Sequence, residues 1–210
     1  MNTKFTVKVA EVQDLQYVPA ILKEIEESAK ERGTGIAKRT ASYLEEKINE
    51  GKAVMAFSAE GEWAGFCYIE TWSNKTYVAN SGLIVSRKFR NEGLARKIKE
   101  VIFNYSRTKY PDAKLFGLTT GLAVMKINSN LGYKPVTYSE LTQDDVFWSG
   151  CKSCVNYEIL MSKERKNCLC TAMLYNPNET KTLENNNIEP ENDQKLFSKF
   201  KKIKTMLWKK

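Results

Sequence analysis

The sequence contains no histidine among its 210 residues. This absence excludes catalytic sets of the Ser-His-Asp and Cys-His type, and it excludes the zinc-protease helix that carries paired histidines. Any proton transfer that the chain performs must use a carboxylate, a tyrosine, a lysine, a cysteine or water.

The sequence also lacks a long apolar run. No segment approaches the roughly 20 apolar residues that a membrane span needs, and residues 1–12 alternate between polar and apolar types, unlike a signal peptide. We therefore expect a protein of the cytoplasm, where a reducing environment keeps the five cysteines out of disulfides. The length fits one domain of roughly 150 residues plus an extension.

The charge is unevenly spread along the chain. The net charge is +8, and residues 192–210 hold seven lysines and one aspartate around apolar residues at helical spacing. An asparagine-rich polar stretch, residues 176–191, precedes this segment. We expect a linker over 176–191 and a basic amphipathic helix over 192–210, which could dock on a membrane surface or a partner. The sequence shows no clear nucleic-acid site and does not determine an oligomeric state.

Apolar periodicity in residues 1–175 predicts one mixed domain. The fold class expected from the order of the elements is α+β: a mixed, mostly antiparallel twisted sheet flanked by helices, with a cysteine-bearing insert over 139–170 before the last strand. Strands are expected at 5–10, 53–59, 63–71, 77–85, 114–119, 134–138 and 169–175, and helices at 13–32, 40–51, 94–105 and 122–130.

The segment after the strand at 77–85 has the features of an anion-binding turn. Gly93 allows close approach of the backbone, and Ala95 keeps the start of the next helix bare. The free N–H groups of a first helical turn, together with the helix dipole, attract a phosphate. On these residues alone, an ordinary strand–helix turn remains the alternative.

The order of the motifs resembles the GNAT superfamily of acyl-CoA-dependent N-acyltransferases. The family pattern Arg/Gln-x-x-Gly-x-Gly/Ala after an apolar strand is filled by Arg90, Gly93 and Ala95. Its later Leu-Gly-Phe/Tyr pattern is matched by residues 131–133, and the resemblance covers roughly residues 5–138. It implies a GNAT-like fold in which the fourth and fifth strands splay apart.

The resemblance also implies where acetyl-CoA or succinyl-CoA, the expected acyl donors, would bind. Backbone N–H groups after the fourth strand would hold the pyrophosphate, and the end of that strand would pair with the pantetheine arm. A backbone N–H near Val85 would stabilise the oxyanion that forms when an amine attacks the thioester. The residues assigned to the donor in this way are Leu83, Ile84, Val85, Arg90, Asn91, Glu92, Gly93, Leu94, Ala95 and Arg96.

The groups for proton transfer depart from the family pattern. The family often has a tyrosine four residues before the glycine of Leu-Gly-Phe/Tyr, where it protonates the leaving thiolate; Asn128 stands there in this chain. An amide can donate a hydrogen bond to sulfur but is not an acid, which leaves water, another tyrosine or an unprotonated thiolate. Glu70 is the candidate base, directly or through water, and an exposed carboxylate without a role is the alternative.

The loop between the first two helices, which lines the acceptor site in the family, is basic here. It contains Arg32, Lys38 and Arg39, and arginine suits bidentate binding of carboxylates. We expect a small carboxylate-bearing amine as acceptor, although a loop without a ligand fits the same residues. A resemblance to GNAT-type N-acylglutamate synthases indicates glutamate and arginine biosynthesis, with another amine as the alternative.

Four cysteines follow a C-x-x-C and C-x-C pattern: Cys151, Cys154, Cys168 and Cys170. A turn and a strand could bring four thiolates together as a structural zinc site without an open position. The alternatives are four small buried side chains or a redox pair. Together with the basic tail, a zinc knuckle would instead indicate a binding module for a membrane or nucleic acid.

Overall fold

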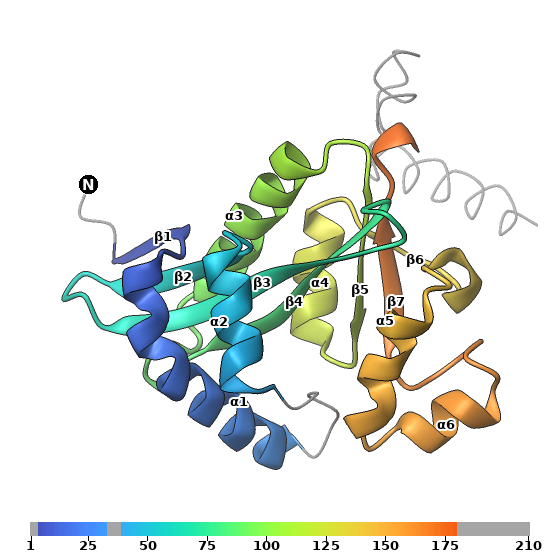
Figure 1. Cartoon of the computed structure of the whole chain (residues 1–210), viewed down its shortest axis with the longest axis horizontal. Coiled ribbons are helices and arrows are strands. Elements are labelled where there is room, and N and C mark those ends of the chain that lie inside the picture. Colours follow the sequence, from blue (N-terminus) through green and yellow to red (C-terminus); the bar gives the residue numbers. More distant parts are fainter. Residues whose placement is uncertain (1–3, 33–38, 180–210) are drawn as a thin grey trace, which may run out of the picture. The chain divides into compact units, whose positions relative to one another are not determined.

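The structure is a computed structural model of the chain, and it describes residues 4–32 and 39–179 (Figure 1). Its contacts divide the chain into one unit over 1–175 and another over 176–210, and every element named below belongs to the first unit. Apart from residues 176–179, the predicted linker and basic helix lie outside the described residues, as does Lys38.

Seven strands form one sheet in the described part of the chain, in the order β1-β2-β3-β4-β5-β7-β6. Each neighbouring pair is antiparallel except β4 and β5, which are parallel. The predicted mixed, mostly antiparallel sheet is therefore confirmed. The strands are β1 (Phe5–Val9), β2 (Ala53–Ser58), β3 (Trp63–Trp72), β4 (Tyr77–Val85), β5 (Lys114–Thr119), β6 (Lys134–Pro135) and β7 (Thr171–Tyr175).

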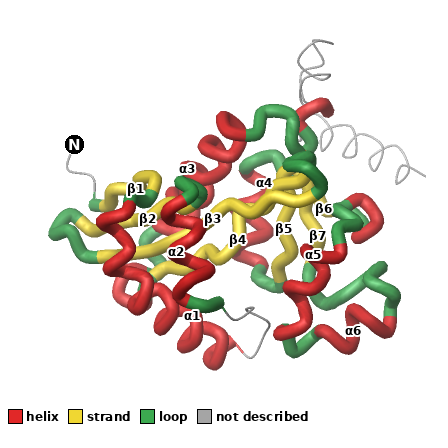
Figure 2. The backbone as a smooth tube through the Cα atoms, in the orientation of Figure 1, coloured by secondary structure: helices red, strands yellow, loops and turns green. Residues whose placement is uncertain are grey.

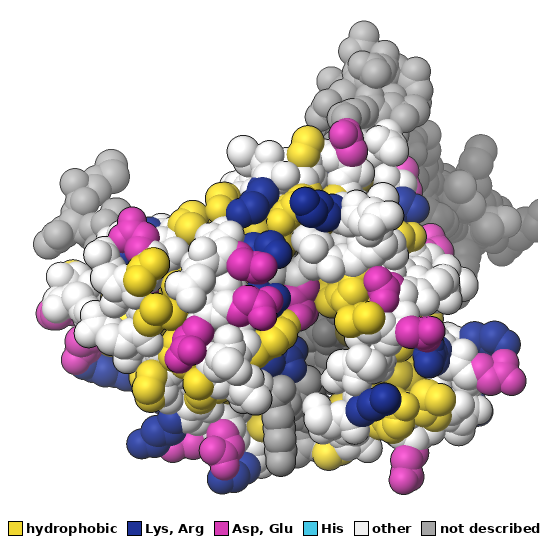
Figure 3. Space-filling model, viewed as in Figure 1, with side chains coloured by type: hydrophobic (Ala, Val, Ile, Leu, Met, Phe, Trp, Pro, Cys, Tyr) yellow, Lys and Arg dark blue, Asp and Glu magenta, His cyan; other side chains and the backbone are white. Residues whose placement is uncertain are grey.

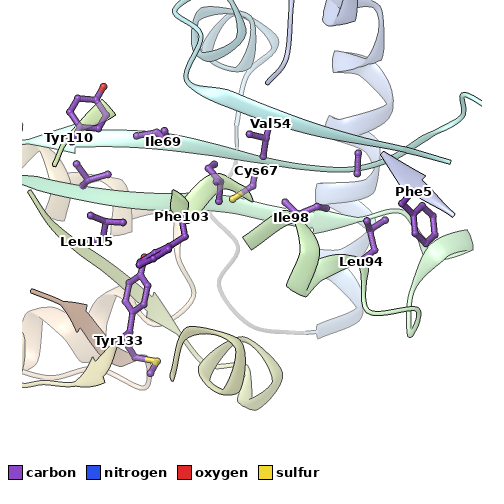
Figure 4. Packing of buried hydrophobic residues seen from close by; sticks show 14 of the residues in the cluster. Phe5, Val54, Cys67, Ile69, Leu94, Ile98, Phe103, Tyr110, Leu115 and Tyr133 are labelled. Atoms are coloured by element: carbon purple, nitrogen blue, oxygen red, sulfur yellow. The ribbon is translucent and has the colours of Figure 1, made fainter. Parts of the chain in front are cut away.

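Helices flank both faces of the sheet (Figures 1 and 2). The apolar side chains of β3 alternate between two cores: Phe66 and Tyr68 pack with α1 and α2, while Cys67 and Ile69 pack with α3. Figure 4 shows part of the core on the α3 face. The long helices are α1 (Val18–Arg32), α2 (Ala41–Asn49), α3 (Leu94–Lys109) and α4 (Leu122–Asn130).

The segment between β6 and β7 folds into short helices that cover β5 and β7. Its core joins Trp148 and Leu160 to Phe116 of β5 and Ala79 of β4. Because Ala79 pairs with Glu70, this segment lies on the same sheet face as α1 and α2. Its helices are η3 (Tyr138–Glu140), α5 (Asp145–Ser149), η4 (Gly150–Ser153) and α6 (Tyr157–Ser162).

Local signals explain several boundaries. The hydroxyl of Thr40 accepts a hydrogen bond from the Tyr43 N–H at 3.2 Å and caps α2, as its sequence predicted. The strand expected over 134–138 is wrong beyond its first two residues, since Pro135 donates no ladder hydrogen bond and Thr137 begins a capped 3-10 turn.

Across the described ranges, no helix is both long and apolar enough to traverse a bilayer.

Candidate active site

The parallel strands β4 and β5 pair only at their beginnings. Residues 77–79 pair with residues 114–116. Beyond that point β4 continues beside β3, and β5 continues beside β7. The two strands diverge in the ribbon view (Figure 1), so residues 80–85 and 117–119 face each other across a gap in the hydrogen-bond ladder. The splay that the resemblance implied is present.

A β-bulge interrupts β4 in its diverging part. Phe66 pairs with Ile84 and Tyr68 pairs with Ser81, so two β4 residues, Gly82 and Leu83, stand opposite one β3 residue. Gly82 has a φ of +65°, and a Cβ there would lie 2.2 Å from Cε1 of Tyr68. Only glycine satisfies both conditions. A bulge leaves its extra residue out of the ladder, next to the position predicted to bind the thioester oxygen.

The start of α3 has the shape of an anion-binding turn. Gly93 is its N-cap with a φ of +77°, no side chain caps the helix, and the first turn contains no acid. Asn91 also has a positive φ, +64°, so two left-handed residues shape the backbone just before the helix. A Cβ on Gly93 would meet nothing within 4 Å. This geometry fits a pyrophosphate held by backbone N–H groups.

The Arg90 side chain points to α1 instead of this turn. Its Nη2 donates hydrogen bonds of 2.7 Å to Glu24 Oε1 and to Ser28 Oγ, and its Nη1 lies 3.3 Å from Glu31 Oε2. Its Nε donates to the carbonyl of Val85 at 3.3 Å. Arg90 therefore positions the loop after β4, and the motif alone did not indicate this role.

The remaining side chains assigned to the donor differ in their surroundings. Glu92 forms an ion pair of 2.5 Å with Lys4, which offsets one negative charge beside the turn. Leu94 is buried in the α3 core, while Arg96 is exposed and has no ion pair among the described residues. Sequence reasoning missed Glu24, although an acid on the periodic apolar face of α1 was a visible signal.

The predicted base and one predicted acceptor-binding arginine come together on the α1/α2 face. Burial raises the pKa of the Glu70 carboxyl, while the Arg39 charge and a hydrogen bond from Ser81 act in the opposite direction. Arg39 Nε donates to the Tyr68 hydroxyl at 2.5 Å, and its guanidinium carbon lies 5.5 Å from the centre of the Tyr43 ring. Arg32 ends α1, and its side chain is outside the described part.

A cavity of about 330 Å³ opens beside Glu70, between α2, the end of β3 and the start of α5. A hollow lies in the middle of this face in the space-filling view (Figure 3). Lys47 contributes an ammonium 4.8 Å from the centre of the Tyr43 ring. The cavity thus brings the Glu70 carboxyl together with the ammonium groups of two lysines. Its lining residues are Tyr43, Lys47, Lys52, Glu70, Thr71, Trp72, Asp144 and Val146.

On the α3/α4 face, Asn128 presents an unpaired acceptor. The residue is 2% exposed; its Nδ2 donates to Met173 Sδ at 3.8 Å, and its Oδ1 finds no hydrogen-bond partner within the part of the chain that the structure describes. A Cβ on Gly117 would lie 3.7 Å from Asn128 Nδ2, so the amide lies over β5 where it leaves β4. An unpaired buried acceptor is unfavourable, and an amide N–H or a thiol of CoA would satisfy it.

The four clustered cysteines meet around one small cavity of about 20 Å³, together with Tyr138 and Leu160. In residues 4–32 and 39–179, however, no group of three or more His, Cys, Asp or Glu side chains is arranged to hold a metal ion. The structure therefore does not support the expected zinc site of Cys151, Cys154, Cys168 and Cys170.

Two features explain the difference. The expected strand over 169–175 begins only at Thr171, so Cys168 and Cys170 do not present their sulfurs from one strand face. Cys168 Sγ donates to the Asn156 carbonyl at 3.8 Å, and Cys154 Sγ accepts from the Asn156 N–H at 3.4 Å.

The sequence matches no family model and no curated protein. Solved structures nevertheless share its architecture. A GNAT superfamily phosphinothricin acetyltransferase from Sinorhizobium meliloti, in complex with AcCoA, superposes with a TM-score of 0.55 at 13% identity over 83% of this chain and 89% of its own. The chain has the GNAT fold.

Two further structures share the GNAT fold at 16% identity and a TM-score of 0.58. One is N-acetylglutamate synthase from Neisseria gonorrhoeae complexed with coenzyme A and N-acetyl-glutamate; the match covers 82% of this chain but only 35% of that enzyme. The other is a Mycobacterium tuberculosis protein in complex with CoA and NLQ, matched over 81% of this chain and 98% of its own. These likenesses concern the fold, and what the neighbours bind belongs to them.

Proposed function

We propose that this protein transfers an acetyl or succinyl group from acyl-CoA to the amine of a small carboxylate-bearing acceptor. One observation carries the proposal: β4 and β5 diverge beyond Ala79, which pairs with Glu70, and the diverging part of β4 leads to a bare anion-binding turn at Gly93. The GNAT fold, shared with acetyltransferases whose structures contain CoA or AcCoA, supports the same activity.

Donor binding would depend mainly on the backbone. The first turn of α3 would receive the pyrophosphate, and the free edge of residues 83–85 would pair with the pantetheine arm. A main-chain N–H near Val85, beside the bulge, would donate to the thioester oxygen as negative charge develops on it. Asn128 Oδ1, to which no described residue donates a hydrogen bond, would accept one from the arm or the thiol.

Glu70 would act as the base. Its raised pKa brings the carboxylate nearer to the range in which a base accepts a proton efficiently at neutral pH. It would take a proton from the attacking amine directly or through water. The positive charge of Arg39 beside it favours the same pocket for a carboxylate of the acceptor.

We infer glutamate as the preferred acceptor, which would place the reaction in arginine biosynthesis. The cavity size, the basic residues Arg39, Lys47 and Lys52, and the base Glu70 suit an amino acid with a second carboxylate. The fold likeness to N-acetylglutamate synthase supports this choice of acceptor.

A screen of CoA release tests the proposal. Acetyl-CoA and succinyl-CoA are each combined with the amino acids, with lysine and with polyamines. Glutamate-dependent release is the expected result. Release with polyamines or lysine and none with glutamate would reject the acceptor class, and no release with any pair would reject acyl transfer itself.

A further inference from the structure

Lys99 is a buried cation without an anion beside it. It projects from α3 among the buried residues Ile98, Ile102 and Phe103, and it keeps 4% of its surface exposed. Among the described residues, its ammonium forms no hydrogen bond and no ion pair. The Tyr133 ring, whose centre lies 5.7 Å from Nζ, provides a weaker cation–π contact. Burying the Lys99 ammonium in this way is unfavourable unless an anion lies beside it.

A neighbouring residue, Cys67, places this ammonium beside the diverging part of β4. Its charge interacts with Cys67, whose Sγ donates to the carbonyl of Ser81 at 3.2 Å. Ser81 directly precedes the bulge at Gly82 and Leu83, and the thioester oxygen is proposed to bind beside this bulge, near Val85. The side chain of Lys99 therefore approaches the bulge from the α3 face.

The residue that begins the splay belongs to the same cluster. Asn80 is the first β4 residue beyond the last pair with β5. Its Oδ1 accepts from the Tyr133 hydroxyl at 3.4 Å, and its Nδ2 donates to Ser106 Oγ at 2.7 Å. Tyr133, whose ring faces Lys99, is thus hydrogen-bonded through its hydroxyl to β4 at the residue where β4 and β5 begin to diverge.

We propose that Lys99 is the catalytic acid that protonates the CoA sulfur as the thiolate leaves. The assignment rests on the proposed function and supplies the acid that position 128 lacks. The acceptor nitrogen forms a bond to the thioester carbon, and the C–S bond breaks with its electron pair going to sulfur. A proton moves from Lys99 Nζ to sulfur, which gives the CoA thiol and a neutral lysine. Glu70 takes the proton that the acceptor nitrogen loses, and solvent restores both residues.

Proton affinities favour Lys99 over its neighbours for this step. Burial lowers the pKa of Lys99, which brings the ammonium closer to a thiol of ordinary pKa, about 8.5. Burial acts in the opposite direction on the other two groups: it raises the pKa of Cys67 to about 11 and also raises the pKa of Tyr133. Both are therefore weaker acids at this place.

The test compares Lys99→Met with wild type, using acetyl-CoA and succinyl-CoA with the best acceptor. We expect kcat to fall roughly 10²-fold with both donors, the usual contribution of an acid, and KM for the donor to change little. The wild-type kcat should decline at high pH as Lys99 loses its proton, and the variant should lack this decline. Lys109→Met, at the far end of α3, is the matched control and should keep wild-type kcat.

Three outcomes would overturn the assignment: a near-normal kcat in Lys99→Met, a rise in KM without a fall in kcat, or a loss confined to succinyl-CoA. The last result would show that the ammonium binds a donor carboxylate instead. If Lys99→Met does not fold, Lys99→Arg replaces it, since a guanidinium keeps the charge but does not give up its proton; a wild-type kcat there would overturn the proton transfer. No CoA release by the wild-type chain would reject the proposed function as well.

Discussion

Arg90 of the glycine motif forms an ion pair of 2.7 Å with Glu24 of α1. The second oxygen of this carboxylate accepts the N–H of Arg87 at 3.3 Å. One acid on α1 therefore holds the loop between β4 and α3 through a side chain and through the backbone. The anion-binding turn at Gly93 belongs to the same loop, so its position depends on a contact with a distant helix.

Arg90→Met should lower both stability and CoA affinity, because it removes the ion pair of Glu24, whose side chain is 10% exposed. Because Arg90 itself is partly exposed, we expect a loss of about 1–3 kcal/mol in the free energy of unfolding. Urea unfolding and calorimetric titration with CoA measure the two effects. Arg96→Met, at an exposed site, should change stability by less than about 0.5 kcal/mol. Weaker CoA binding with unchanged stability in Arg90→Met would instead indicate a direct phosphate contact.

Gly82→Ala should destabilise the protein more than Gly61→Ala. Both positions have positive φ, +65° and +82°, so alanine is strained at each by about 1–2 kcal/mol. At Gly61 the added Cβ meets nothing within 4 Å, whereas at Gly82 it would lie 2.2 Å from the Tyr68 ring. Overpacking should add about 1–3 kcal/mol at Gly82. Chemical denaturation compares the two variants, and equal losses would show that the bulge can move away from Tyr68.

Glu70→Gln should lower kcat roughly 10²-fold or more, because glutamine cannot accept a proton. In the wild type, kcat should rise with pH as the Glu70 carboxyl, whose pKa is raised by burial, becomes ionised. The variant should lose this rise. Glu60→Gln, on the exposed β2–β3 turn, is the matched control and should behave as wild type. A normal kcat in Glu70→Gln would exclude Glu70 as the base.

The same variant should change how stability depends on pH. A raised pKa means that the folded state binds the proton more tightly, so this contribution is complete at low pH and is lost as pH rises through the folded value. Glutamine does not titrate, so the variant does not lose this contribution to stability as pH rises. Relative to wild type, Glu70→Gln should therefore gain stability as pH rises above the ordinary carboxyl pKa, about 4.3. Parallel changes in both proteins would contradict the burial effect at Glu70.

Chelators should leave the melting temperature unchanged. The described cysteines form no metal-holding group, and burial raises the pKa of Cys151 and Cys170. Thermal unfolding with and without phenanthroline, together with metal analysis of the purified protein, checks this. A fall in melting temperature that added zinc reverses would contradict it and restore the sequence expectation.

Features that depend on neighbouring residues could be predicted from the sequence. The bounds of β4 and α4 match the expected ranges, since the apolar period and the turn residues of these segments are local. The Thr40 cap was predictable for the same reason. The strand expected to carry Cys168 and Cys170 was wrong at its start, because this segment packs against the helices before β7.

The sequence by itself determined the long helices, most of the strands, their order and the motif that marks the bare start of α3, because these depend on periodicity and on short-range chemistry. Tertiary structure decided what surrounds the site. Arg90 meets Glu24 across 66 residues of chain, and Asp144 of a later segment reaches the cavity beside Glu70. The burial of Lys99 likewise depends on Tyr133 and on the packing of α3. Such contacts join segments that are distant in sequence, and no local pattern encodes which charge is left without a partner.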